Sequence, residues 1–80
     1  MTTKHLLTVE LAPAYDVVHI CGDKEGLEAL ANALLEVAKK GGERLLATEA
    51  HDGHDLSQAS QLQAARLVHR LSIHNVKKKK

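Results

Sequence analysis

Histidine and aspartate side chains gather in one short polar stretch of this 80-residue chain, His51, Asp52, His54 and Asp55. Imidazole nitrogens and carboxylate oxygens are ligands for zinc and related ions, and His69 or His74 could complete such a set. A closed metal site needs four matched ligands, however, and the same residues suit a solvated turn. We therefore assign no cofactor and no metal, and keep His51 and His54 as weak candidate ligands.

A second arrangement could supply a nucleophile. His19 and Cys21 share one face of an expected strand, and Cys21 stands just before an expected helix, whose amino end favours the thiolate. The sequence offers no group to orient the histidine. We therefore expect Cys21 to be a small buried residue, and we do not expect the protein to be an enzyme. Gly22 and Gly26 bracket the same helix start, but the neighbouring carboxylates oppose phosphate binding there.

The stretch from Gly22 to Gly42 predicts one amphipathic helix. Its apolar residues recur with the helical period and form one stripe, which we expect to face the core: Leu27, Leu30, Ala31, Leu34, Leu35 and Ala38. Asp23 suits the N-cap position, and Lys39 and Lys40 complement the negative end of the helix dipole. Gly41 or Gly42 can end the helix in a left-handed conformation.

Alternating patterns predict strands at residues 5–11, 15–21, 43–50 and 67–76. Pro13 marks a bend between the first two strands, and residues 51–55 form a turn. Residues 57–66 fit a short helix as well as a polar loop. The second strand is apolar on both faces, as expected if it is central or makes a further contact.

The element order, ββαββ, predicts a two-layer α+β fold. One long helix would cover one face of a four-stranded, mainly antiparallel sheet, and the other face would be exposed. If strands two and three were parallel, their connection would be right-handed. We expect a single domain over residues 1–76, followed by a solvated lysine tail at 77–80.

The amino-acid composition limits the possible functions of the protein. Without lysines 77–80, seven basic residues stand against ten acidic residues, a net charge of −3, which argues against a nucleic-acid-binding surface. The single cysteine excludes an internal disulfide, and no apolar run approaches the ~20 residues of a membrane span. We expect a cytoplasmic protein.

The chain resembles the immunity protein thirty-two family of bacterial polymorphic toxin systems. The resemblance rests on the run from His19 to Ala31, on the leucine-rich helix with its Gly-Gly end, and on the run from Arg66 to Ile73. Where such proteins tend to have histidines in the third strand and a Trp-Gly-Gly turn, this chain has Arg44-Leu45-Leu46 and Asp52-Gly53-His54. The resemblance implies a non-enzymatic inhibitor that binds a toxin tightly.

We therefore expect an immunity-type protein that occludes a toxin domain, with a basic nuclease as a fitting partner because complementary charge speeds association. The candidate contacts are Asp16, Glu25, Glu28 and Glu36, or the turn residues His51, Asp52, His54 and Asp55. The alternative is a small metal- or ligand-binding module that uses His51 and His54, with a homodimer formed through the open sheet face.

Overall fold

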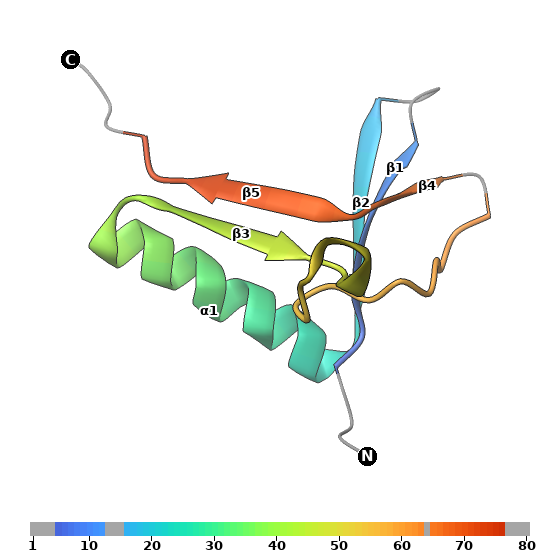
Figure 1. The fold of residues 1–80 in the computed structure, drawn as a ribbon, viewed down its shortest axis with the longest axis horizontal. Helices are drawn as coiled ribbons and strands as arrows, with labels where there is room; N and C mark the ends of the chain where they lie inside the picture. Colours follow the sequence, from blue (N-terminus) through green and yellow to red (C-terminus); the bar gives the residue numbers. More distant parts are fainter. Residues whose placement is uncertain (1–4, 13–15, 64, 77–80) are drawn as a thin grey trace.

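The computed structural model describes residues 5–12, 16–63 and 65–76, and its elements follow the predicted ββαββ order (Figure 1). They are β1 (Leu7–Ala12), β2 (Val17–Gly22), α1 (Lys24–Lys40), β3 (Glu43–Ala47), a 3₁₀ helix (Glu49–His51), β4 (Arg66–Val68) and β5 (Arg70–His74). The predicted bend at Pro13 and the lysine tail 77–80 lie outside the described residues. No described helix is long and apolar enough to cross a membrane.

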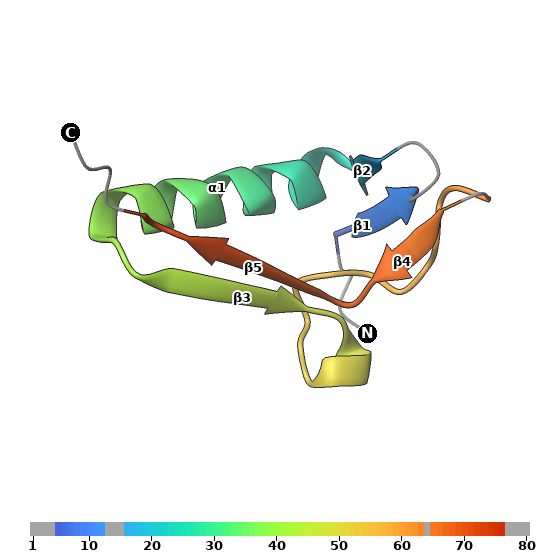
Figure 2. The same ribbon diagram turned by 90° about the horizontal axis from the view of Figure 1, so that it is seen from above.

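The strands form two antiparallel sheets, so the prediction of a single four-stranded sheet is wrong. One sheet has the order β2-β1-β4, and the other consists of β3 and β5. Because β2 and β3 lie in different sheets, they do not form the parallel pair that a right-handed crossover would join. Figure 2 shows the β3–β5 pair beside α1 and the three-stranded sheet at the amino end of the helix.

The predicted last strand serves both sheets because Ser57 occupies the edge of β1 that β5 would need. Leu7 accepts a hydrogen bond from the Ser57 N–H (2.6 Å) and donates its own N–H to the Ser57 hydroxyl (3.1 Å). The last strand pairs with β1 only as far as Val68 and then turns away at His69, whose carbonyl accepts the N–H of Thr48 (2.9 Å). Beyond this bend, β5 pairs with β3.

The ends of α1 confirm the predicted caps. Asp23 is the N-cap residue, and its carboxylate accepts the N–H of Gly26 at 2.7 Å. Gly41, with φ of 80°, ends the helix and donates its N–H to the carbonyl of Val37 (2.8 Å). Lys39 and Lys40 lie in the last turn, where positive charge stabilises the helix dipole.

The buried face of α1 is rotated from the predicted stripe. The buried helix residues are Gly26, Leu30, Ala33 and Val37, so Leu30 alone of the six predicted core residues is buried. The cause is Gly26, which lies against the backbone of Leu6 so closely that an added Cβ would stand 1.8 Å from the Leu6 carbonyl oxygen. This close approach leaves Leu27 and Leu34 45% and 47% exposed.

The hydrophobic core lies between α1 and the inner faces of both sheets. It contains Leu7, Val9, Leu30, Ala33, Leu46 and Leu56. The opposite face of β1 was expected to be exposed, but Thr8 and Glu10 on that face are fully buried. Residues 57–63 contain no helix, and Ser60, Gln61 and Leu62 of this segment cover Glu10 through hydrogen bonds. Of the segment 57–66 that fitted a helix or a loop, residues 57–63 are therefore loop and Arg66 begins β4.

Candidate partner-binding surface

The turn after β3 is held by a dense set of hydrogen bonds. Thr48 accepts the N–H groups of His51 (3.0 Å) and Gly53 (2.9 Å) on its carbonyl oxygen, and Asp52 donates its N–H to Glu49 (3.1 Å). Asp52 adopts a left-handed conformation with φ of 62°, which aspartate tolerates better than most residues. These hydrogen bonds define the shape of the turn.

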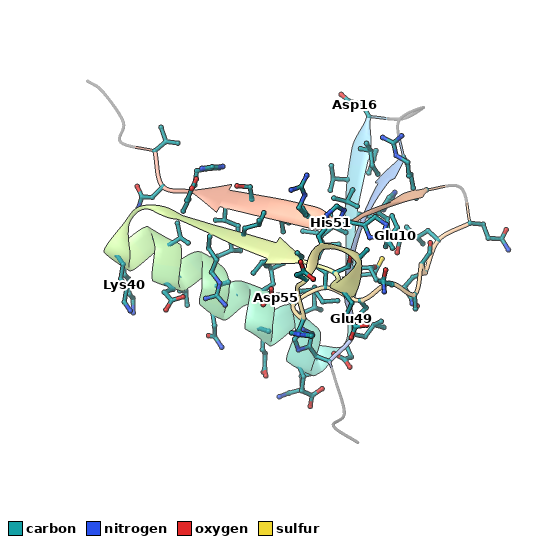
Figure 3. The ribbon with its side chains drawn as sticks, viewed as in Figure 1. Glu10, Asp16, Lys40, Glu49, His51 and Asp55 are labelled. Atoms are coloured by element: carbon teal, nitrogen blue, oxygen red, sulfur yellow. The ribbon has the colours of Figure 1, made fainter. Side chains whose placement is uncertain are left out.

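Asp55 belongs to the support of this turn. Its carboxylate accepts the N–H of Ala47 (3.4 Å), and its carbonyl accepts the Nε2–H of His5 (2.8 Å). By contrast, Glu49, His51, Asp52 and His54 are exposed, and we call these four residues the turn surface. Figure 3 shows Glu49, His51 and Asp55 on the same part of the molecule.

The histidines near the turn form two separate pairs. The rings of His51 and His69 lie 5.8 Å apart, and His69 Nδ1 is hydrogen-bonded to the Thr48 hydroxyl (2.8 Å). His54 Nδ1 lies 3.9 Å from Glu49 Oε2. His74, the other candidate ligand, pairs with Glu43 at the far end of β5. Within the described ranges, no three His, Cys, Asp or Glu side chains converge as a metal site.

A pocket of about 240 Å³ opens beside the turn surface. Its lining combines polar side chains with one buried leucine: His5, Glu49, His54, Leu56, Ser57 and Gln58. The pocket is therefore a concavity of mixed polarity that borders the exposed Glu49 and His54.

The four predicted carboxylates do not form one patch. Asp16 precedes the first residue of β2, and Glu25 lies after its last, about 20 Å away for a six-residue strand. Figure 3 places Asp16 at the end of the β1–β2 hairpin that is remote from α1. Glu28 pairs with Lys24 (3.0 Å), and Glu36 is shared by two cations, Arg44 and Lys40.

His19 and Cys21 both lie on β2 and are half-buried, so the expectation of a fully buried cysteine is wrong. No side chain in the described residues hydrogen-bonds to either of them. The N–H of Gly26 is already bonded to the Asp23 carboxylate, and Gly26 itself is buried against Leu6. The helix start is therefore occupied by the chain's own groups.

Sequence reasoning missed Glu10, which has 0% exposure. Burial raises the pKa of its carboxyl, but hydrogen bonds from the Gln61 N–H, the Thr8 and Ser60 hydroxyls and the Leu62 N–H lower that pKa from 4.5 to about 2. The distances from its oxygens to these donors are 2.8 to 3.1 Å. The only available signal was Thr8 two positions before it on the same strand face.

Comparison with known proteins identifies one family. A family model described as Immunity protein 32 matches residues 17–67. No curated protein and no solved structure matches the chain. The matched region covers more than half of the chain and includes β2, α1, β3 and the turn surface, so the chain belongs to the immunity protein 32 family.

Proposed function

We propose that this protein neutralises a toxin domain by binding it through the turn surface, without catalysing a reaction. Family membership supports a toxin-neutralising role. The observation that carries the choice of surface is the fixed geometry of the turn, in which Thr48 accepts two backbone hydrogen bonds and Asp55 holds Ala47. A surface that is rigid before binding loses little conformational entropy in the complex.

Charge supports a basic partner such as a nuclease. Without the terminal lysines, the chain has a net charge of −3, and the carboxylates of Glu49 and Asp52 stand on the exposed side of the turn. In a nuclease complex, these carboxylates would occupy the positions at which the toxin binds substrate phosphates. Opposite charge would also accelerate association with such a cleft.

The turn surface is a better candidate than the helix carboxylates. Glu28 pairs with Lys24 and Glu36 with Arg44, while Glu49 lies 3.9 Å from His54, so the choice of surface rests on how the residues are placed in the fold. Asp16 lies at the opposite end of β2 from Glu25, so one compact toxin surface would reach only part of that set. Glu49, His51, Asp52 and His54 come from one short segment.

The test is protection of a bacterial host that expresses a candidate toxin domain taken from the reading frames next to this chain's gene. We expect the unaltered chain to restore growth and to bind the purified toxin directly. The double variant Glu49→Gln with Asp52→Asn removes two charges and keeps the shape, since asparagine also tolerates a left-handed backbone. We expect it to bind the toxin about 10 to 100-fold more weakly.

The matched control is Glu25→Gln with Glu28→Gln, which removes the same charge from α1. It should leave toxin binding within about threefold, a difference below 1 kcal/mol. Loss of binding in this control, with full binding in the turn variant, would move the interface to α1. Failure of the unaltered chain to bind the toxin or to protect the host would reject the proposed function itself.

A further inference from the structure

The strand β2 has an open outer edge with no charged residue. Its sequence is Val-Val-His-Ile-Cys-Gly, and all six residues pair with β1 without a bulge. In the described part of the chain, no strand pairs with its other side. Natural edge strands are usually protected by lysine, proline, bulges or a covering segment. The absence of these features from β2 suits pairing with another strand.

The backbone of β2 is aligned for such pairing. Leu7 directs its N–H and carbonyl to Ser57, away from β2, so the residue opposite it, Gly22, directs its own groups away from β1. These directions alternate along a strand, and therefore Val18 and Ile20 also present their N–H and carbonyl groups at the outer edge.

Apolar side chains surround this edge on the face that carries the core. Val18 and Ile20 lie opposite Leu11 and Val9, yet they are 60% and 49% exposed, because α1 covers only the Gly22 end of β2. An added Cβ on Gly22 would stand 3.3 Å from the side chain of Leu27. The half-exposed Leu27 therefore lies beside this end of β2, and Leu34, which is 47% exposed, follows it two helical turns later along α1.

We propose that two copies of this chain form a dimer in which β2 pairs antiparallel with the partner's β2. A two-fold axis through His19 places Val18 opposite the partner's Ile20, and Ile20 opposite the partner's Val18. The two residues then exchange backbone hydrogen bonds through groups that already point outward. The result is a continuous six-stranded sheet with both α1 helices on the same face.

We expect the strand that pairs with β2 to come from a second copy of the chain, because β2 is complementary to itself in this register. Each β-branched side chain meets another across the interface, a favourable cross-strand pair, and no charge is buried. The additional burial matters because, among the described residues, three of the nine buried hydrophobic residues are alanines and eight large hydrophobic residues are exposed.

The proposed register predicts which cysteine substitution will form a disulfide between the two copies. Val17 faces the partner's Cys21 in a pair without backbone hydrogen bonds, where Cβ atoms come close enough for a disulfide. Two copies of the native Cys21 are four residues out of register and stay apart. Under mild oxidation, Val17→Cys should therefore give a disulfide-linked dimer, whereas the unaltered chain should not. Cross-linking in the unaltered chain, or none in Val17→Cys, would contradict this register.

The association itself is tested by analytical ultracentrifugation of the full chain across a range of concentrations. We expect a mass of twice 8.7 kDa. Val18→Lys with Ile20→Lys should raise the dimer dissociation constant by about two orders of magnitude, because symmetry introduces each charge twice. The matched control Leu45→Lys changes a residue that is 54% exposed in the other sheet and should leave the dimer intact.

A monomeric mass for the unaltered chain at all concentrations would overturn the proposal. Equal loss of the dimer in the Leu45→Lys control would also overturn it, since the contact would then lie elsewhere. If the chain stayed monomeric and the Val18→Lys, Ile20→Lys variant lost toxin binding, this edge would be the toxin interface and the second copy would be rejected. Circular dichroism establishes that each variant is folded.

Discussion

The buried carboxylate of Glu10 accepts the backbone N–H of Gln61 at 2.9 Å, across a sequence separation of 51 residues. The same carboxylate accepts the Leu62 N–H (3.1 Å) and the Ser60 hydroxyl (2.9 Å). One side chain of the central strand thus holds a segment that has no regular structure of its own. Ser57 is attached separately to Leu7, so Glu10 holds the part of the segment from Ser60 to Leu62.

We expect Glu10→Gln to lower the free energy of unfolding by about 2–3 kcal/mol, because glutamine replaces one acceptor oxygen with a donor that faces other donors. Urea denaturation followed by circular dichroism measures the loss. Glu43→Gln, which changes a largely exposed glutamate in β3, should cost less than about 0.5 kcal/mol. Equal losses in both variants would contradict the anchoring role of Glu10.

The free energy of unfolding should depend on pH because of the same residue, Glu10. Because hydrogen bonds lower the pKa of Glu10 from 4.5 to about 2, its stabilisation is present above pH ~4.5 and is lost as the pH falls toward 2. The difference in unfolding free energy between the unaltered chain and Glu10→Gln should therefore shrink over that range. A difference that stayed constant from pH 5 to pH 2 would show that the charge of Glu10 is not responsible.

Gly26→Ala should destabilise the protein, although alanine favours a helix by about 1 kcal/mol over glycine. The added Cβ would meet the Leu6 carbonyl oxygen at 1.8 Å, so α1 must shift away from β1. We expect a loss of at least about 3 kcal/mol in chemical denaturation, as for other overpacked cores. The control Asn32→Ala, at an exposed helix position, should stabilise slightly; a stabilising Gly26→Ala would refute the close contact.

Asp52 and Asp55 should differ in what their replacement changes. Asp55→Ala removes the acceptor of the Ala47 N–H and should lower stability by about 1–2 kcal/mol. Asp52→Asn changes only an exposed charge, so its stability should be preserved while toxin affinity falls. Thermal unfolding and calorimetric titration with the toxin measure the two effects separately. Reduced stability in Asp52→Asn would mean that this side chain supports the turn.

Zinc should not raise the melting temperature. His51 faces His69, whereas His54 faces Glu49, so the turn offers two separate pairs instead of one closed set of four ligands. Differential scanning fluorimetry with added zinc and with a chelator measures the effect. A rise that disappears in a His51→Ala, His54→Ala variant would revive the metal-binding alternative.

Local patterns were enough to predict the helix and its ends. Asp23 and Gly41 act within a few residues of the groups they cap, and the caps are confirmed. Four strands were expected and each is present in part: β3 ends at Ala47, so the predicted strand over residues 43–50 is too long, and β4 and β5 divide the last one. These features depend on contacts between near neighbours in the sequence, which periodicity and capping rules describe.

The remaining features depend on contacts between distant residues. The division into two sheets follows from the pairing of Leu7 with Ser57, and the rotation of α1 follows from the contact of Gly26 with Leu6. Neither contact has a signature in a single sequence. Glu10 looked like the polar side of a half-exposed strand because nothing nearby predicted that a distant loop would cover it.

The pairing of β1 with β4 also determines when the three-stranded sheet can form during synthesis of the chain. Val9 lies opposite Val68, so β1 cannot pair with β4 until residues 66–68 have been synthesised. Contacts this distant make folding slower than local ones do. During synthesis, the ribosome must release the last strands before the turn surface acquires its support from His69. Before residues 66–69 have been made, the three-stranded sheet lacks β4, and Thr48 lacks its hydrogen bonds to His69.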